Sequence, residues 1–152
     1  MLYFAYGSNM DFTQMQDRCT SAKFICVAKL ADYRLAFPRF SKNRGCGVSD
    51  AVAEKGDSVW GVVYEVSEGD MTRLDVSEGF REGRPKSKNS YNREQIQVWR
   101  DGEHNQPMLV WIYLANPHLP NAEYKNLLVN GATHWGLPVS YIEQLKRIKI
   151  SE

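Results

Sequence analysis

A short apolar run that ends abruptly at a glycine is the feature that most constrains the fold of this chain. Residues 2–6 have the character of a β-strand, the turn Gly7-Ser8-Asn9 follows directly, and residues 11–18 have helical character. A turn from a strand into a helix exposes unpaired backbone N–H groups, and glycine lets the main chain approach a ligand closely. The pattern therefore predicts either an anion-binding turn or an ordinary loop, and both interpretations stay open at this level.

The length of the chain predicts one hydrophobic core. A chain of 152 residues is about the size of a single domain and buries roughly two-thirds of its unfolded surface when it folds. The sequence contains no linker, internal repeat or low-complexity tract. We therefore expect residues 1–152 to form a single domain.

The charge balance gives no reason to expect a nucleic-acid or membrane partner. The chain has 19 Lys and Arg against 18 Asp and Glu, so its net charge at pH 7 is +1. No apolar run comes near the roughly 18 residues of a membrane-spanning helix, and the first strand pattern begins without a signal-peptide pattern. We expect a cytoplasmic protein that is a monomer or a homodimer.

The cysteines and histidines predict neither a disulfide framework nor a metal site. Cys19, Cys26 and Cys46 form an odd, irregularly spaced set without a Cys-x-x-Cys pair. The three histidines have no second metal-ligating side chain at the spacing of a zinc site. We therefore expect free thiols and no bound metal.

The pattern of apolar residues predicts strands first and two helices last. This order is typical of an α+β domain with a mostly antiparallel or mixed sheet. A tight turn is expected at Ala31-Asp32, and a surface loop over residues 38–47. The expected strands, rich in β-branched and aromatic residues, are residues 24–30, 33–37, 49–53, 59–66, 91–100 and 108–115.

Helix signals are clear in the middle of the chain and near its end. Ser67, followed three residues later by an acid, predicts a helix N-terminus, and Gly79 is the residue type found just past a helix C-terminus. We expect a short helix over residues 68–77. Helical spacing returns from Asn121, and Pro138 starts an amphipathic helix that we expect to pack on the sheet.

Glu78 is the candidate for proton transfer. It lies at the end of the short predicted helix, directly before a glycine and a phenylalanine. At the rim of a partly apolar cavity, desolvation would raise its pKa toward the range that is useful for moving protons. The alternative on these residues alone is an exposed acid at a helix end. Asp75, three residues earlier, faces the same way if the helix is regular.

Several blocks of sequence together resemble the gamma-glutamylcyclotransferase family. The resemblance spans nearly the whole chain, and the combination of the Tyr-Gly-Ser-Asn turn with Leu-Asp-x-x-Glu-Gly is more specific than either piece. It implies a compact barrel of mixed strands flanked by helices, with a substrate cavity at one end. The blocks are residues 2–10, 59–64 and 74–79, and the tail positions Tyr124, Gly131-Ala132 and Gly136-Leu137-Pro138.

The resemblance also implies the chemistry and the residues that perform it. The α-amine of a gamma-glutamyl compound attacks its own γ-carbonyl, which yields 5-oxoproline and a free amine or amino acid, without a cofactor. The Gly7-Ser8-Asn9 turn would hold the glutamyl group, and Glu78 would be the catalytic acid and base. Further candidates for substrate contact are Tyr6, Tyr91 and Tyr124, with ordinary strand or core packing as the alternative for Tyr91 and Tyr124.

Two other functions stay open from the sequence. The first is a non-catalytic binding or regulatory module that uses the same pocket for a small molecule. The second is nucleic-acid binding through the basic residues 81–88, which the near-zero net charge disfavours. The loop over residues 80–90 is expected to border the leaving amine, whose identity the sequence does not give.

Overall fold

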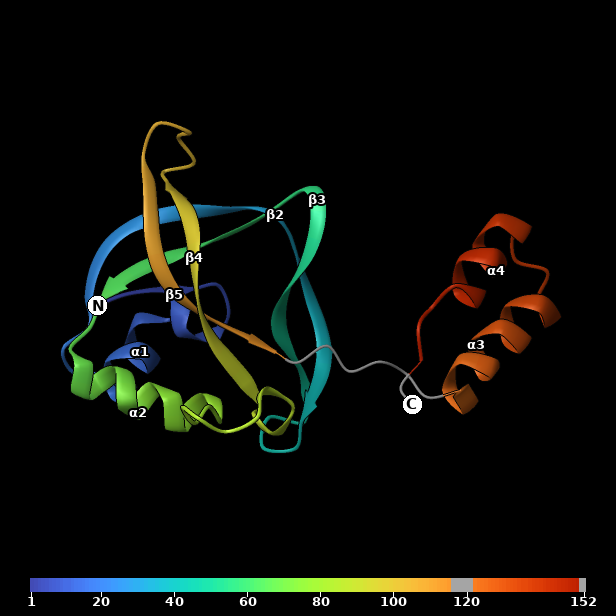
Figure 1. Cartoon of the computed structure of the whole chain (residues 1–152), viewed down its shortest axis with the longest axis horizontal. Helices are drawn as coiled ribbons and strands as arrows, with labels where there is room; N and C mark the ends of the chain where they lie inside the picture. The colour runs from blue at the N-terminus through green and yellow to red at the C-terminus, as the bar shows by residue number, and fades with distance from the viewer. Residues whose placement is uncertain (116–121, 151–152) are drawn as a thin grey trace. The chain divides into compact units, whose positions relative to one another are not determined.

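The computed structural model describes residues 1–115 and 122–150. The chain falls into two compact units, Met1–Asn116 and Pro117–Glu152. The described part of the first unit contains a closed barrel whose strands follow the spatial order β1-β3-β2-β4-β5 (Figure 1). The strands are β1 Leu2–Ala5, β2 Lys23–Ser41, β3 Cys46–Glu65, β4 Tyr91–Arg100 and β5 Pro107–Ala115.

The barrel is mixed, as the sequence predicted. Strand β1 pairs antiparallel with β3 and parallel with β5, where Tyr3 lies opposite Trp111. The pairs β2–β3, β2–β4 and β4–β5 are antiparallel. Helices α1, Phe12–Arg18, and α2, Glu68–Glu78, lie side by side along one side of the barrel (Figure 1). The predicted α+β barrel flanked by helices is confirmed.

Strand β2 is one long strand, so the predicted tight turn at Ala31-Asp32 is wrong. The chain passes through Asp32 in the left-handed conformation, at φ 62°, and the β2–β3 register shifts there. The Asp32 carboxylate accepts a hydrogen bond of 3.0 Å from the Gly56 N–H across the ribbon. Aspartate tolerates positive φ better than most residues, so the same local signal that marks a turn also marks a bulge.

The predicted surface loop over residues 38–47 is also mostly strand. β2 continues to Ser41, β3 begins at Cys46, and only the short turn between them is irregular. The expected strands 49–53 and 59–66 are likewise parts of the single strand β3, which ends one residue short of Val66. Cross-strand hydrogen bonds to β2 keep these polar segments extended, and a polar hairpin tip has no apolar pattern by which to predict it.

Helix α2 begins where the sequence predicted and ends one residue later, at Glu78. The Ser67 side chain accepts a hydrogen bond from the Asp70 N–H at 3.1 Å, which caps the first turn. At the other end Gly79 adopts a left-handed φ of 68°, and its N–H bonds back to the last turn. A Cβ at Gly79 would lie 2.7 Å from the Cβ of Ser90. These two ends fix the position of Glu78 as the last residue of the helix.

Asp70 ties the start of α2 to the chain after α1. Its carboxylate accepts a hydrogen bond of 2.8 Å from the Ser21 N–H. Hydrogen bonding from the side chain and the backbone of Ser21 holds the pKa of Asp70 below its ordinary value. We expect Asp70→Asn to lower the free energy of unfolding at pH 7 by about 1 kcal/mol. The difference begins to shrink near pH 4, the ordinary pKa of an aspartate, and vanishes as the pH falls through the lower folded-state pKa.

Urea unfolding of both proteins between pH 3 and pH 7 measures this difference. Asp17→Asn is the control, because Asp17 is exposed on α1 and no hydrogen bond or ion pair of its side chain is found in the described residues. A constant difference between wild type and Asp70→Asn across the pH range would contradict the assigned role of the Asp70 charge.

Two apolar clusters lie inside and outside the barrel wall. The interior cluster contains Phe4, Val63, Val98 and Ile112. The outer cluster packs α1 and α2 against the wall and is centred on Tyr3, Met15, Tyr64, Met71, Leu74 and Tyr113. Successive residues of β1 thus point alternately into each cluster, which anchors the strand on both sides just before the turn that follows it.

The described part of the second unit consists of α3, Ala122–His134, and α4, Val139–Lys146, which pack on each other. Gly136 has a φ of 66° between them, and Pro138 precedes α4, as the sequence predicted. That α4 packs on the sheet, and that residues 1–152 form a single domain, both stay predictions. None of the helices in residues 1–115 and 122–150 is long and apolar enough to cross a membrane.

Candidate active site

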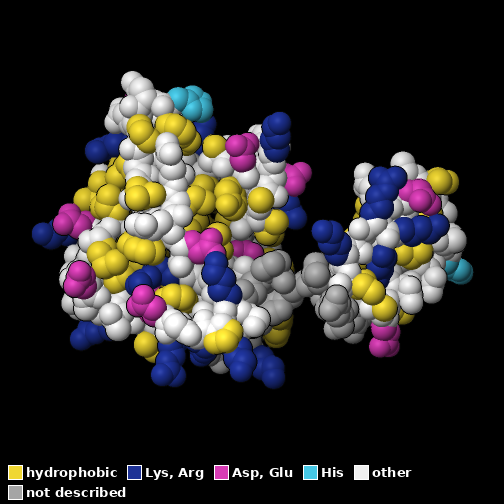
Figure 2. All heavy atoms as spheres, viewed as in Figure 1, with side chains coloured by type: hydrophobic (Ala, Val, Ile, Leu, Met, Phe, Trp, Pro, Cys, Tyr) yellow, Lys and Arg dark blue, Asp and Glu magenta, His cyan; other side chains and the backbone are white. Residues whose placement is uncertain are grey.

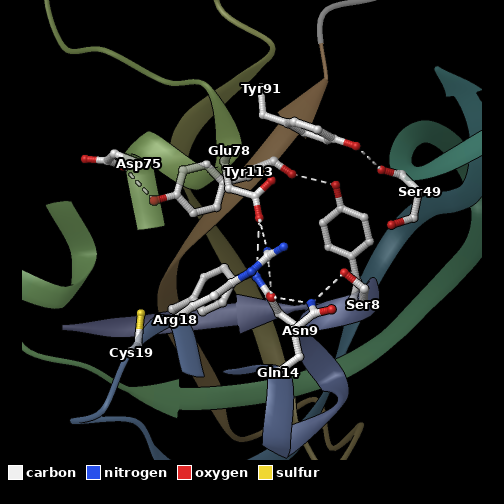
Figure 3. A network of polar contacts seen from close by, with 12 residues as sticks. Ser8, Asn9, Gln14, Arg18, Cys19, Ser49, Asp75, Glu78, Tyr91 and Tyr113 are labelled. Atoms are coloured by element: carbon white, nitrogen blue, oxygen red, sulfur yellow. Dashed lines mark hydrogen bonds and ion pairs between the residues drawn. The ribbon is translucent and has the colours of Figure 1, made fainter. Parts of the chain in front are cut away.

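A cavity of about 760 Å³ lies where β1 ends and β4 begins. Its walls come from the turn after β1, the end of α1, the tip of the β2–β3 hairpin, the last turn of α2 and the first residues of β4. Figure 3 shows the polar contacts around it. The residues that line it are Tyr3, Tyr6, Gly7, Ser8, Asn9, Arg18, Arg39, Phe40, Ser41, Lys42, Asn43, Arg44, Val48, Ser49, Val76, Ser77, Glu78, Gly79, Ser90, Tyr91 and Tyr113.

The turn predicted after β1 is present and lines this cavity. Gly7 leads into a single 3-10 turn, Ser8–Met10, and α1 begins only at Phe12, after Asp11 has capped it. The first N–H groups of such a turn have no partner within the turn itself, so those of Ser8 and Asn9 are available as donors. Asn9 is buried, at 3% exposure, whereas Ser8 is exposed.

Asn9 joins the turn to α1 and α2. Its Nδ2 donates to Glu78 Oε1 at 3.3 Å and to Tyr3 Oη at 3.1 Å. Its Oδ1 accepts hydrogen bonds of 3.0 Å each from Gln14 Nε2 and Arg18 Nη1. Because two donors face the oxygen, the amide nitrogen is directed at the Glu78 carboxylate. The structure therefore brings together two predicted site residues that are 69 positions apart in the sequence.

Glu78 is mostly buried, with its side chain 17% exposed. Burial raises the pKa of this carboxyl above its ordinary value, and Arg18, the Asn9 hydrogen bond and Arg44 act in the opposite direction. Arg18 Nη1 lies 3.6 Å from Glu78 Oε1. Glu78 is thus a desolvated acid that retains a cationic neighbour, an environment typical of groups that exchange protons.

Tyrosine hydroxyls form another part of the wall. Tyr6 Oη donates to the Tyr113 carbonyl at 2.5 Å, and Tyr91 Oη donates to the Ser49 carbonyl at 2.8 Å. Burial is the main cause that raises the pKa of Tyr91 to about 12, and burial likewise raises the pKa of Tyr6. Both hydroxyls therefore stay protonated near neutral pH. Tyr6 and Tyr91, predicted from the sequence as candidates, both line the cavity.

Asp75 is not available as a second acid. Its Oδ1 accepts a hydrogen bond of 2.6 Å from Tyr113 Oη, and its Oδ2 forms an ion pair of 2.9 Å with Arg93 Nη1. The Arg93 guanidinium lies over the Trp111 ring, at 4.8 Å from its centroid. Asp75 therefore fastens the last turn of α2 to β4 and β5 and does not line the cavity.

The sequence analysis missed the cations of this cavity. Arg39, Lys42 and Arg44 come from the tip of the β2–β3 hairpin. Arg44 Nη2 contacts Gln14 Oε1 at 3.0 Å and Ser8 Oγ at 3.3 Å, so the tip reaches the turn after β1. Basic side chains gather along the lower edge of the barrel unit in Figure 2, where Figure 1 places the β2–β3 turn and the loop after α2.

The loop over residues 80–90 contributes one residue to the cavity wall, and that it borders the leaving amine stays a prediction. Of its described residues, Ser90 lines the cavity, and Arg39 donates hydrogen bonds of 2.8 and 3.0 Å to it. Arg84 folds back, with Nε 2.6 Å from Asn89 Oδ1 and Nη2 2.7 Å from the Gly79 carbonyl. The hairpin tip, and not this loop, supplies most of the cavity wall opposite the turn. A hairpin tip that folds over a distant site leaves no local signal in the sequence.

Tyr124 is the remaining predicted site residue. It belongs to α3, but its side chain lies outside the described residues. Its contact with substrate stays a prediction.

The fold and the site together define a class of protein. Beside a closed mixed barrel lies a cavity that is lined by the mostly buried Glu78 carboxylate, a turn of backbone donors and several cations, which suits a small molecule that carries both an acid and a protonated amine. The chain belongs to the gamma-glutamyl cyclotransferase, AIG2-like family, whose model matches residues 3–135. The family predicted from the sequence blocks is confirmed, and it is a family of enzymes.

Known relatives agree with this assignment over nearly the whole chain. The gamma-glutamylcyclotransferase of Mus musculus is 35% identical over 158 aligned residues, which cover 99% of this chain and 80% of the relative. The gamma-glutamylcyclotransferase of Homo sapiens is 34% identical and covers 97% of this chain and 78% of the relative. A solved gamma-glutamyl cyclotransferase structure superposes with a TM-score of 0.66 at 31% identity, covering 100% of this chain and 89% of that one.

Proposed function

We propose that this protein releases 5-oxoproline and an amine or amino acid from a small gamma-glutamyl compound. The family supports the reaction type. The observation that carries the proposal in this chain is the mostly buried Glu78 carboxylate, held 3.3 Å from Asn9 in the turn after β1. A proton acceptor thus lies beside a set of fixed hydrogen-bond donors, which is the pairing that the reaction needs.

The first step is the activation of the substrate's own α-amine. This amine arrives as an ammonium ion, which has no free electron pair with which to attack the γ-carbonyl. Glu78 takes one of its protons, and the neutral amine then closes a five-membered ring on the carbonyl carbon. The wall formed by Tyr6, Tyr91 and the turn favours the folded conformation of the glutamyl chain. This conformation holds the α-amine close to the γ-carbonyl carbon that it attacks.

The second step is the departure of the amine half. The carbonyl oxygen carries negative charge in the tetrahedral intermediate, and the N–H groups of Ser8 and Asn9 are the donors that we assign to it. The amide nitrogen leaves only when it is protonated. Glu78 gives this nitrogen the proton that it took from the α-ammonium group, and the carbonyl re-forms as the bond to the leaving nitrogen breaks. The ring nitrogen gives up its one remaining extra proton to the released amine, which departs as ammonium, so the carboxylate is regenerated and no net proton is consumed.

The direct test is product formation from a panel of gamma-glutamyl amino acids and gamma-glutamyl amines. We expect 5-oxoproline, quantified by chromatography and mass spectrometry, from at least one member of the panel. A folded sample that forms 5-oxoproline from none of them would contradict the proposal. If the same sample bound gamma-glutamyl compounds tightly without turnover, the alternative of a binding module would be favoured.

The leaving half of the substrate meets a cationic wall. Lys42 and Arg44 line the cavity, and neither has a carboxylate partner within the part of the chain that the structure describes. The glutamyl half carries one ammonium and one carboxylate group, so it does not neutralise these two cations. We therefore propose that an anionic leaving half is preferred over a neutral one, and a neutral one over a cationic one.

Three matched substrates test this charge preference: gamma-glutamylglycine, its glycinamide analogue, and gamma-glutamyl-ethylenediamine. We expect kcat/KM at low salt to fall about fivefold at each step of this series, since a single solvent-exposed charge contact is worth about 1 kcal/mol. The double variant Lys42→Gln, Arg44→Gln is expected to flatten the series, whereas Lys55→Gln, at an exposed position of β3 outside the cavity, should leave it unchanged. Equal values for all three substrates in the wild type would contradict the preference.

A further inference from the structure

Arg18 occupies a central place in the site although no sequence motif pointed to it. It is the last residue of α1, and its side chain is 29% exposed. Its Nη1 atom lies 3.0 Å from Asn9 Oδ1 and 3.6 Å from Glu78 Oε1. Figure 3 shows the Arg18 guanidinium between Asn9 and Glu78, directed into the cavity. One cationic group therefore contacts both halves of the candidate site.

Glu78 has two conflicting requirements. To accept a proton from the substrate it must be ionised while the cavity is still empty. Its burial favours the neutral acid, because a carboxylate that leaves water loses most of its solvation. A neighbouring cation that offsets this cost favours the ionised form of Glu78 in the free protein.

The groups around Glu78 show which neighbour does so. Tyr3 from β1 and Tyr91 from β4 face it as neutral phenols, and Asn9 from the turn donates one hydrogen bond. Arg44 is the more distant cation, and its Nη2 is already held by Ser8 and Gln14. Within the described residues, the salt bridge found for Glu78 is the one to Arg18.

We propose that Arg18 is a positioning residue for Glu78. Arg18 holds the Glu78 carboxylate ionised in the empty cavity, and the α-ammonium group of the substrate then takes over the contact with this carboxylate. This inference rests on the proposed function, because it assigns Arg18 a part in that reaction. The substrate ammonium replaces one cationic contact with another, so the carboxylate is never left buried without a partner.

The same contact serves the second proton transfer. Once Glu78 has taken the proton it is a neutral acid, and a cation nearby stabilises the carboxylate to which it will return. Arg18 therefore makes Glu78 a readier donor to the leaving nitrogen. The proton passes from the α-ammonium to Glu78 and then to the leaving amine, while Arg18 keeps its charge throughout.

Arg18 also orients Asn9. With Arg18 and Gln14 both donating to Asn9 Oδ1, the Nδ2 group of Asn9 faces Glu78 Oε1. Loss of Arg18 removes one of these two donors and leaves the other. The amide orientation should thus largely survive, so the main effect of Arg18→Gln is on the charge of Glu78.

The kinetic test compares Arg18→Gln, Arg18→Lys and the control Arg100→Gln, whose side chain pairs with Asp101 away from the cavity. The acidic limb of the kcat/KM profile reports ionisation of the base in the free enzyme. We expect Arg18→Gln to move this limb to higher pH by about one unit, since a close opposite charge lowers an acid's pKa by one unit or more. Arg18→Lys keeps the positive charge, so its acidic limb should stay near the wild-type position, and Arg100→Gln should cause no shift.

A second measurement does not depend on turnover. In protein labelled with ¹³C at the glutamate side chains, the Glu78 carboxyl signal is assigned by its absence in Glu78→Gln, and its titration midpoint is followed. We expect the midpoint to rise in Arg18→Gln and to stay near the wild-type value in Arg18→Lys. An unchanged midpoint in Arg18→Gln overturns the inference, whether or not the protein forms 5-oxoproline.

The two measurements separate the inference from the proposed function. If the wild type forms no 5-oxoproline but the midpoint rises in Arg18→Gln, the proposed function fails and the control of Glu78 ionisation by Arg18 stands. If 5-oxoproline forms and Arg18→Gln raises KM with an unchanged acidic limb, the inference is overturned, and Arg18 is a substrate-binding residue.

Discussion

Glu78→Gln is expected to fold normally and to lose at least about a thousandfold in kcat. General acid and base catalysis each contribute between about a hundredfold and ten thousandfold to a rate, and we assign both roles to this one carboxyl. Glutamine has nearly the same shape and keeps an oxygen that accepts the Asn9 hydrogen bond, so the cavity should keep its form. The measurement is steady-state release of 5-oxoproline, with circular dichroism as the check on folding.

Glu94→Gln is the matched control for this change. Glu94 lies on β4 outside the cavity and pairs with Lys86 at 3.0 Å, and its side chain is 41% exposed. Its kcat should stay within about twofold of the wild type, because a surface ion pair contributes at most about 1 kcal/mol to stability and does not touch the substrate. A Glu78→Gln protein that kept most of its activity would refute the assignment of Glu78 as the proton carrier.

Gly61→Ala is expected to lower the free energy of unfolding by about 3 kcal/mol, the upper end of the usual cost of overpacking. A Cβ at Gly61 would lie 2.3 Å from the Ala5 carbonyl oxygen and 2.7 Å from the Phe4 ring. The carbonyl belongs to the backbone of β1 and cannot rotate away, so β1 and β3 must separate. Because β1 leads directly into the turn of the candidate active site, activity should fall together with stability.

Gly69→Ala is the control for this second change. Gly69 lies in the first turn of α2, and a Cβ there would meet no atom within 4 Å. Alanine is the better helix former, so this variant should gain up to about 1 kcal/mol. Urea unfolding of both variants measures the two effects. If Gly61→Ala were as stable as Gly69→Ala, the claim that the close approach of β1 to β3 requires a glycine at position 61 would be contradicted.

The parts of the fold that were predicted correctly are those with local chemical causes. Ser67 caps α2 through the Asp70 N–H, and Gly79 ends the helix because it adopts a positive φ. Strands β4 and β5 follow the alternation of apolar residues, with Ile96 opposite Val110. In each case the residues that decide the structure lie within a few positions of it, so a pattern in the sequence is enough to predict it.

The errors lie where distant partners decide the structure. Asp32 is a residue type that is typical of turns, yet β2 runs through it because β3 continues to pair with β2 on both sides of the bulge. The hairpin tip with Lys42 and Arg44 has no apolar pattern, and its place beside the cavity depends on contacts with Ser8 and Gln14, far away in the chain.

The sequence by itself determined the family, the turn after β1, the carboxyl at the end of α2 and the mixed barrel. It did so because caps, glycines and apolar periodicity act over a few residues, and because the family blocks recur in order along the chain. Only the tertiary structure decided that Arg18 lies between Asn9 and Glu78, and that Asp75 pairs with Arg93 and accepts a hydrogen bond from Tyr113. The physical reason is that the charge state and the partners of a buried side chain depend on what the whole fold packs around it.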